Sequence, residues 1–329
     1  MNGFSIIICT YNPSIRLIKR LFTAINQFET DCFQVEVLLI DNNSTLQLSK
    51  HIFVQDFLSF NPTYRIIREN EPGLTSARLA GIKASKFDWL IFFDDDNEPD
   101  SDYLIHASEV INKFNFVRVW GPGKITVEFT SEPSDWLFRN KKIFQDKNEH
   151  EFRFDNKPDW QKCYPYGTGM LVQREIALSY VERVCDGRYT ICDRNGKSLS
   201  SGGDVQIVLT AIEKGFQAGV APSLKLTHLI DSKKANLKYM VKQQYGTASA
   251  SILAFNQVFI KSPILLNHIN NSDIFLRIYS LYRIYKKDLD KRDFKLLIAS
   301  KIGEFNASVY ASGQSKPLLL RFYEWMINV

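Results

Sequence analysis

The chain has 329 residues, of which 45% are hydrophobic and 23% are charged, and its formal net charge is +5. This composition is typical of a globular protein, and the length suits one large domain with an appendage or two domains. So small a net charge gives no reason to expect a nucleic-acid partner. The sequence opens without a basic and apolar leader and holds no run of about 18 apolar residues, so neither export nor a bilayer span is expected.

The five cysteines lack the paired spacing of a metal or redox motif. Cys9 lies in an apolar run and is expected to be a small buried hydrophobe. Cys185 and Cys192 flank an Asp186-Gly187 turn, so a disulfide across a hairpin is one alternative. An odd, sparse set of cysteines without an export signal favours reduced thiols and a cytoplasmic protein.

Strand and helix patterns alternate along the first hundred residues. Apolar β-forming runs are separated by stretches with apolar residues at helical spacing, such as Ile15 to Phe28. The predicted strands cover residues 4–9, 34–40, 64–67 and 89–93. This alternation predicts an α/β fold with a mainly parallel, Rossmann-like central sheet and helices on both faces.

Polar clusters follow three of the predicted strands directly. These clusters are Thr10-Tyr11-Asn12, Asp41-Asn42 and Asp94-Asp95-Asp96. In open α/β sheets, ligands bind outside the carboxyl ends of the strands. We therefore expect the three clusters to meet at one ligand site.

The acidic run at Asp94, Asp95 and Asp96 is the most informative of these clusters. If the strand continued, Asp94 and Asp96 would point to one side and Asp95 to the other. Adjacent carboxylates repel one another unless a cation or a hydrogen-bond network neutralises them. Few oxygen ligands at a strand end suit Mg²⁺ or Mn²⁺ that substrate phosphates also hold. The alternative is a solvated acidic turn that caps the next helix.

Beyond Pro99 the pattern is less regular. Residues 128–160 are charged and aromatic and are expected to form a long loop over a site. Tyr166 to Val172 is predicted as a strand interrupted by glycines, and Gly202-Gly203-Asp204 opens a predicted helix that runs through Lys214. From about Lys234 onward the pattern is mostly helical.

The order of these motifs resembles that of the family 2 glycosyltransferases, which are inverting enzymes with the GT-A fold. The resemblance covers roughly residues 3 to 230, and six elements in the right order make it specific. The matching elements are Cys9-Thr10-Tyr11-Asn12, Ile40-Asp41-Asn42-Asn43-Ser44, Asn70 to Arg78, Phe93-Asp94-Asp95-Asp96-Asn97 at the DxD element, Gly167-Thr168-Gly169-Met170, and Gly202 to Gln206 with Gly215-Phe216 and Ala221-Pro222.

Three positions depart from the family pattern. Gly203 and Gln206 stand where acidic residues usually flank the catalytic Asp, and Asn97 stands where many members carry another Asp. The first two departures weaken the assignment of a catalytic base to this segment. An Asn at the end of the acidic run remains a suitable oxygen ligand or hydrogen-bond partner.

The resemblance implies a GT-A catalytic domain over residues 1–232, with nucleotide-sugar binding in 1–100 and the acceptor side and base in 101–232. It also implies that Mn²⁺ or Mg²⁺ is held by Asp94 and Asp96, with His228 at the metal or the diphosphate. A lone His is as readily a plain polar residue. The implied donor-binding residues are Thr10, Tyr11, Asn12, Asp41, Asn70, Gly73, Arg78, Asp94 and Asp95.

Each donor-side role has a structural alternative. Tyr11 would stack on the nucleotide base, or merely precede the turn at Pro13. Asp41 would accept hydrogen bonds from a uracil or ribose, or cap a helix. Arg78 would bind a phosphate or pair with the acidic run, and these two roles are compatible.

On the acceptor side, the resemblance makes Asp204 the base that deprotonates the acceptor hydroxyl. The alternative for Asp204 is an N-terminal helix cap. Trp136, Trp160 and Tyr166 are expected to form a wall on which a sugar stacks, unless these rings belong to the core. The implied acceptor site also includes Gly167, Thr168 and Gly169.

Residues 233–329 lie beyond the resemblance and are predicted to be helical. Residues 279–287 mix aromatic side chains with cations, and residues 318–326 are amphipathic and aromatic. Such segments can lie on an anionic membrane surface, which would make this a peripheral contact at the inner face of the membrane. The alternatives are a helical subdomain packed on the catalytic core and the interface of a homodimer.

The sequence thus predicts an inverting glycosyltransferase with a nucleotide-sugar donor, UDP-linked, and a glycan or lipid-linked acceptor. The product would be a polysaccharide, lipopolysaccharide or glycoprotein glycan. A nucleotidyltransferase is one rival, but its glycine-rich phosphate loop is replaced here by Thr10-Tyr11-Asn12-Pro13. A non-catalytic glycan- or nucleotide-binding module is the other; Gly203 and Gln206 favour it and the acidic run opposes it.

Overall fold

The computed structural model describes residues 3–191, 193–194, 199, 201–261, 268–285 and 289–329. The chain divides into two compact units. The first contains residues 3–188 and 207–231, and the second contains the described parts of 189–206 and 232–329. The boundary between the units falls within helix α7, Gly203–Glu213.

The first unit is built on a sheet with the order β3-β2-β1-β4-β9-β6-β10-β5, with β7 beside β6 and β8 beside β10. The strands are β1 Gly3–Thr10, β2 Gln34–Asn42, β3 Tyr64–Glu69, β4 Trp89–Asp94, β5 Asn97–Pro99, β6 Val117–Phe129, β7 Lys147–Asn148, β8 Arg153–Asp155, β9 Met170–Gln173 and β10 Gln217–Ile230. The helices and 3₁₀ turns are α1 Ile15–Asn26, η1 Leu48–Lys50, α2 Ile52–Ser59, α3 Leu74–Ala84, α4 Tyr103–Lys113, α5 Asp135–Arg139, η2 Lys141–Phe144 and α6 Arg174–Cys185.

Strands β1 to β4 are mutually parallel, as the strand–helix alternation predicted. The remainder of the sheet is mixed, because β9 runs antiparallel to both β4 and β6 while β10 runs parallel to β6. The sheet is therefore less uniformly parallel than the sequence suggested, although the α/β fold class is confirmed.

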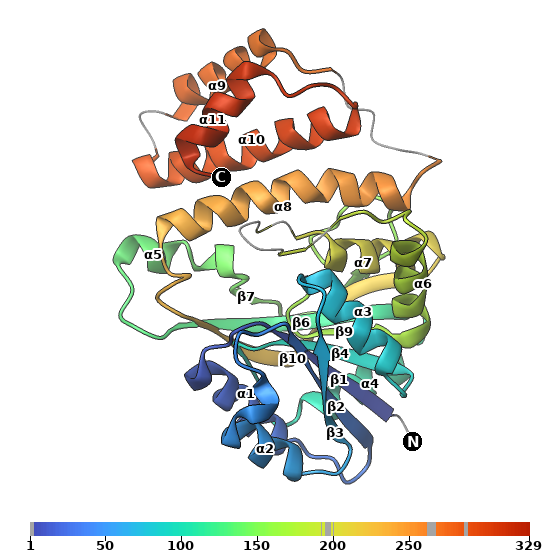
Figure 1. Cartoon of the computed structure of the whole chain (residues 1–329). Coiled ribbons are helices and arrows are strands. Elements are labelled where there is room, and N and C mark those ends of the chain that lie inside the picture. Colours follow the sequence, from blue (N-terminus) through green and yellow to red (C-terminus); the bar gives the residue numbers. More distant parts are fainter. Residues whose placement is uncertain (1–2, 192, 195–198, 200, 262–267, 286–288) are drawn as a thin grey trace. The chain divides into compact units, whose positions relative to one another are not determined.

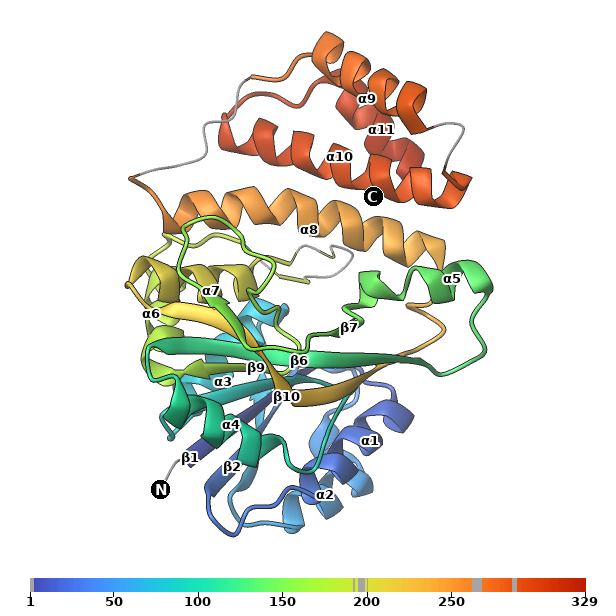
Figure 2. The ribbon, with the colours of Figure 1, turned by 180° about the vertical axis from the view of Figure 1, so that it is seen from behind.

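Helices cover both faces of this sheet (Figures 1 and 2). On one face, α1, α2 and α4 share a hydrophobic core with side chains of the sheet, which include Phe4, Ile6 and Ile8 of β1. On the other face lie α3 and α6. Gly81 lets α3 approach the sheet closely, since a Cβ atom there would lie 2.5 Å from Ile7 Cγ2.

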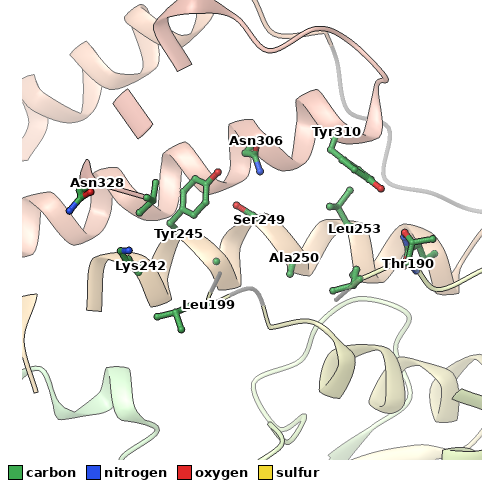
Figure 3. Close-up of a pocket in the computed structure, with 14 residues that line it drawn as sticks. Thr190, Leu199, Lys242, Tyr245, Ser249, Ala250, Leu253, Asn306, Tyr310 and Asn328 are labelled. Carbon is green, nitrogen blue, oxygen red and sulfur yellow. The ribbon is translucent and has the colours of Figure 1, made fainter. Parts of the chain in front are cut away.

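The second unit is mainly helical. Its long helices are α8 Leu237–Val258, α9 Asn271–Tyr285, α10 Lys291–Ala311 and α11 Leu318–Ile327. Helix α10 packs along α8, and Gly303 makes this approach possible because a Cβ atom there would lie 2.5 Å from the Tyr245 carbonyl oxygen. A cavity of about 560 Å³ is lined by Tyr245 and Ser249 of α8 and by Asn306 and Tyr310 of α10 (Figure 3).

Two sequence predictions, one on membrane-spanning segments and one on the cysteines, can be compared with this fold. Across the described residues, every helix is too short or too polar to cross a membrane. The described cysteines, which are Cys9, Cys32, Cys163 and Cys185, are free. Cys192, which the hairpin alternative pairs with Cys185, lies outside the described residues. Cys9 is partly exposed at the end of β1 rather than fully buried.

Candidate active site

The polar clusters after β1, β2 and β4 lie at one edge of the sheet. The strand register pairs Thr10 with Asp41 and Cys9 with Asp94. The neighbouring register pairs Asp41 with Arg68 of β3. The loops after β1 and β2 are also tied together, because the Asn12 amide N–H donates to Ser44 Oγ at 3.0 Å. The sequence prediction that these clusters converge therefore agrees with the strand register.

The acidic run forms a tight turn between β4 and β5. Strand β4 ends at Asp94, so the predicted alternation of side chains does not extend to Asp95 and Asp96. The buried Asn97 closes the turn: its Oδ1 accepts from the Asp94 amide at 3.0 Å, and its Nδ2 donates to Asp96 Oδ1 at 3.2 Å. Thr10 Oγ1 donates to Asp95. The Asp95 and Asp96 carboxylates thus face different partners.

Asp96 faces a histidine across this turn. The Asp96 side chain is buried, and its Oδ1 lies 3.5 Å from His228 Nε2. His228 Nδ1 lies 2.9 Å from the carbonyl oxygen of Phe144. A carbonyl oxygen can only accept, so Nδ1 carries a proton. Nε2 faces the Asp96 carboxylate, an arrangement that a proton or a cation between the two atoms stabilises.

A positive charge balances the acidic run from α3. Arg78 is buried in that helix, one turn beyond its start at Leu74. Desolvation raises the pKa of the Cys9 thiol to about 12; Arg78 opposes this shift, and Asp94 and Asp95 add to it. The guanidinium and both carboxylates therefore act on the same small region, as expected for a cation that offsets the acidic run.

The loop before α3 is fixed by Asn42 of β2. Asn42 Nδ2 donates to the Glu71 carbonyl oxygen at 2.7 Å, and Asn42 Oδ1 accepts from the Gly73 amide at 2.8 Å. Gly73 has φ = +126°, a conformation that favours glycine. Asn70 is exposed at the end of β3. The predicted donor loop is thus anchored through its backbone.

Asp41 is buried and its carboxylate is engaged by the protein itself. Its Oδ1 accepts from the Ser44 amide at 3.1 Å, and its Oδ2 accepts from the Leu48 amide at 3.0 Å and from Arg68 at 2.7 Å. Burial alone would raise the pKa of Asp41, but hydrogen bonds from Leu48, Ser44 and Arg68 hold it below its usual value. This geometry gives Asp41 a structural role in the loop after β2.

Tyr11 differs from Asp41 in its exposure. Its side chain is 61% exposed, next to Asn12, whose φ is +46°. The Asn12 side chain closes the turn by accepting from the Thr45 amide at 2.9 Å. An exposed ring at a strand end offers a face on which a base can stack.

The predicted acceptor residues divide into two groups. Trp160 and Tyr166 have ring centroids 5.5 Å apart, and Tyr166 is partly exposed. Trp136 lies on α5 and is only 5% exposed, so its ring offers little surface for stacking. Gly167 and Gly169 lie in a turn, because β9 begins only at Met170.

That turn is held next to the acidic run. Thr168 Oγ1 lies 3.4 Å from Asp94 Oδ2, and the buried Tyr103 hydroxyl donates to the Gly169 carbonyl oxygen at 2.6 Å. Gly169 has φ = +66°, and a Cβ atom there would lie 2.6 Å from Leu226. Glycine is therefore required at this position, which the strand prediction did not anticipate.

Asp204 lies in the first turn of α7 and is buried, with its Oδ1 accepting from the Val205 amide at 3.0 Å. Asp193 accepts from the amides of Gly202, at 2.7 Å, and Gly203, at 2.9 Å. Gln206 Nε2 donates to Gln257 of α8 at 2.7 Å. Because Asp193 takes the amides at the start of α7, the helix does not depend on Asp204 alone as its cap.

A family model described as glycosyl transferase family 2 matches residues 5–179, which is more than half of the chain. The chain belongs to this family. The resemblance seen in the sequence is thereby confirmed, and the protein is a glycosyltransferase. A search of curated proteins found no match.

Solved structures agree on the fold of this family 2 member. The mannosyltransferase PcManGT from Pyrobaculum calidifontis, in complex with GDP-Man and Mn²⁺, is 16% identical, with a TM-score of 0.53 over 92% of this chain and 86% of that chain. GalNAc-T7 with UDP, GalNAc and Mn²⁺ is 14% identical, with a TM-score of 0.52 over 100% and 57%. S. aureus TarS 1-349 is 14% identical, with a TM-score of 0.49 over 95% and 92%. At such identities the first two show the fold alone.

The side chains at the acidic turn are suitable ligands for a divalent cation that a diphosphate also binds. Among the described residues, no group of three or more His, Cys, Asp and Glu side chains could hold a metal by itself. Mg²⁺ and Mn²⁺ are commonly bound by one or two carboxylates together with substrate phosphates. Asp96 and His228 supply such a partial set, and the Phe144 carbonyl orients the imidazole as second-shell partners of metal-binding histidines do.

One contributor to this family 2 site was missed from the sequence. Arg68 binds Asp41 and also donates to Asn43 Oδ1 at 2.9 Å. Arg68 is the register partner of Asp41 in the neighbouring strand β3, and this pairing is not visible in the sequence.

Proposed function

We propose that this glycosyltransferase is an inverting enzyme that transfers a sugar from a nucleotide-diphosphate donor, UDP-linked, to a glycan or lipid-linked acceptor. The pathway would be polysaccharide or lipopolysaccharide biosynthesis. The observation that carries the proposal is the buried Asp96 carboxylate, whose Oδ1 faces Nε2 of His228, with the Phe144 carbonyl at Nδ1 of the same ring. Both side chains are held in place by the protein itself, so a cation would gain coordination at little cost in reorganisation.

In this proposal Asp96 and His228 hold Mn²⁺ or Mg²⁺, with Asp94 as a further ligand or as a contact to the donor ribose. When bound, the cation neutralises charge on the leaving diphosphate. Asn97 keeps Asp96 in place, and Arg78 offsets the remaining negative charge of the acidic run. Asp95 supports the turn through Thr10.

The nucleotide would lie along the edge formed by the ends of β1, β2 and β4. The exposed Tyr11 ring supplies a face for the base. Direct contact of Asp41 with the donor remains a prediction. The hydrogen bonds that Asp41 accepts support a role in positioning Arg68 and the loop after β2. Asn42 sets the backbone at Gly73, where a phosphate can approach closely.

Asp204 is proposed as the base that takes the proton of the acceptor hydroxyl, which makes the reaction a single displacement with inversion. One support is the order of the motifs. The other is Asp193, which accepts hydrogen bonds from the amides at the start of α7, so the helix depends less on Asp204 as a cap. Trp160 and Tyr166 form the proposed stacking wall, beside the turn at Thr168.

Further sequence predictions about domains, location and oligomeric state accompany this proposal. A catalytic domain over residues 1–232, a helical region over 233–329, a cytoplasmic location and a homodimer all remain predictions. None of them enters the chemistry at the acidic turn. An assay of nucleotide-sugar turnover distinguishes glycosyl transfer from the two rival interpretations, a nucleotidyltransferase and a non-catalytic binding module.

The test is the release of nucleoside diphosphate from a panel of nucleotide sugars with Mn²⁺ or Mg²⁺. The purified protein is compared with Asp96→Ala and Asp204→Asn and, as a matched control, with Asp56→Asn on the exposed side of α2. Metal-dependent release from one donor, lost in the first two variants and kept in the third, supports the proposal. Nucleotide binding without release, even when acceptor lipids are supplied, would favour a binding module instead.

A further inference from the structure

The C-terminal region differs sharply in charge from the rest of the chain. Residues 232–329 carry 15 Lys and Arg against 6 Asp and Glu, a net charge of +9. Residues 1–231 carry 26 Lys and Arg against 30 Asp and Glu, a net charge of −4. The overall charge of +5 therefore hides a strongly basic helical region. Such a region is attracted to anionic surfaces.

Helix α11 presents an apolar stripe to solvent. Leu318 is 74% exposed and Trp325 is 76% exposed, and Phe322 and Met326 are about half exposed. Their spacing places all four on one helix face. The Phe322 and Trp325 rings lie with centroids 6.0 Å apart. The opposite face of α11 is the one that packs inward, through Leu320 and Ile327.

Helix α9, which packs beside α11, repeats this arrangement. The Leu319 amide of α11 donates to Asn271 Oδ1 at the start of α9, at 2.9 Å. Phe275 and Tyr279 of α9 stack with ring centroids 5.9 Å apart, and both rings are about half exposed. Leu276 beside them is also exposed. Two neighbouring helices thus each expose aromatic and aliphatic side chains.

Unpaired cations accompany these rings. Arg283 of α9 and Arg321 of α11 are exposed, and neither forms an ion pair with another residue in the described part of the chain. Lys316, by contrast, is bound by Glu324 at 2.8 Å. Large aromatic side chains flanked by Arg and Lys are typical of segments that lie in the headgroup region of a membrane.

Charge decides between a membrane and a second copy of the chain as the occupant of this surface. Self-association through α9 and α11 would bring two regions of net charge +9 together, and like charges at an interface oppose binding. Anionic headgroups instead complement the free guanidinium groups while the acyl boundary buries the rings.

We propose that the exposed faces of α9 and α11 dock this protein on an anionic lipid bilayer. Leu318, Phe322, Trp325 and Met326 enter the headgroup region, and Arg283 and Arg321 contact lipid phosphates. The docking does not require sugar transfer, so it can hold or fail independently of the chemistry at the acidic turn.

The experiment is co-sedimentation of the full chain with vesicles of phosphatidylcholine alone, or of phosphatidylcholine mixed with phosphatidylglycerol. The variant is Phe322→Ser with Trp325→Ser, whose side chains are exposed, so folding should be retained. The matched control is Ile52→Ser on α2, another apolar side chain that is 74% exposed. Circular dichroism and thermal unfolding check that each variant is folded.

We expect the wild type and the Ile52→Ser control to bind the anionic vesicles and to bind phosphatidylcholine much less. The double variant should lose about tenfold or more in vesicle partitioning, since two large apolar side chains no longer become buried. A folded double variant that binds like the wild type overturns the proposal, as does equal binding to both vesicles. Absence of vesicle binding with a dimer lost in the double variant would assign the surface to self-association instead.

Discussion

The two compact units use charge in different ways. In the first unit, carboxylates, guanidinium groups and amides converge at one sheet edge, where Asn97, Thr10 and Arg68 hold the acidic groups in fixed positions. In the helices α9 and α11 of the second unit, charged side chains lie on the surface, and Arg283 and Arg321 have no ion pair with a described residue. The first arrangement is organised in advance for a ligand of defined shape, whereas the second suits a broad anionic surface.

The net charge of the whole chain therefore says little about where a site lies. The sequence as a whole carries +5, yet the candidate active site is acidic and the candidate docking surface is basic. Burial distinguishes them, because Asp96 is buried while Arg321 is exposed. Substitutions in the candidate active site should alter turnover, whereas substitutions in the C-terminal helices should alter helix packing or attachment to a membrane.

The largest expected effect is that of Asp204→Asn. An amide cannot accept the acceptor proton, so turnover should fall by about 100-fold to 10,000-fold. The thermal midpoint should hardly change, since Asn caps helices as well as Asp does and Asp193 holds the amides of Gly202 and Gly203. Turnover assays and thermal unfolding check this; activity close to wild type would leave Asp204 with only a structural role.

A smaller effect is expected for His228→Ala. Loss of Nε2 opposite Asp96 should weaken metal-dependent activation by about 10-fold to 100-fold, measured as the Mn²⁺ concentration for half-maximal turnover. His106, which binds Asp102 and Glu109 on the surface of α4, provides the control in His106→Ala. Equal Mn²⁺ requirements in the wild type and the His228 variant would contradict the assignment.

Packing in the second unit is tested by Gly303→Val. A side chain at this position collides with the Tyr245 carbonyl oxygen, so the helical unit should lose about 1–3 kcal/mol of stability. Ala311→Val, at the exposed end of α10, introduces the same side chain without the collision. Denaturant unfolding of both variants measures the difference, and equal stability would show that α8 and α10 pack differently.

The smallest expected effect concerns Asp41. Its pKa in the folded protein lies below the usual value, so its contribution to stability is present above that usual value and is lost as the pH falls through the lowered pKa. Asp41→Asn should cost about 1–2 kcal/mol near neutral pH, through weaker hydrogen bonds to Arg68 and the loop amides. Denaturant titrations should show the difference from wild type shrinking in acid; a difference that grows in acid would contradict this sign.

The sequence predicted the first part of the fold well, because the evidence there is local. Apolar runs fixed β1, β2 and β4, and parallel pairing then brought Thr10, Asp41 and Asp94 to one edge. The helix at Gly203 was likewise predicted from its glycines and Asp204. Of the predicted strand at residues 166–172, residues 170–172 belong to β9, but residues 166–169 do not, and Gly169 has a positive φ in a turn whose carbonyl oxygen Tyr103 binds.

The pairs that define the site could not be predicted from local patterns. Asp96 and His228 meet because β5 and β10 are antiparallel neighbours, with Asn97 opposite His228. The Phe144 carbonyl reaches His228 from the end of η2, within residues 128–160, where the sequence predicted a long loop and the structure has α5, η2, β7 and β8. In the C-terminal region the amphipathic pattern of α11 was visible, but Gly303 in the middle of α10 revealed its role only through the contact with α8.

The most direct test of the central claim is calorimetric titration of the protein with UDP, and with GDP for comparison, in the presence of Mn²⁺ and again with a chelator. The claim is that Asp96 and His228 hold a divalent cation together with a nucleoside diphosphate. We predict binding that requires Mn²⁺, is lost in Asp96→Asn and is unchanged in Asp56→Asn. Binding that is equally strong with the chelator, or that survives in Asp96→Asn, would contradict the claim.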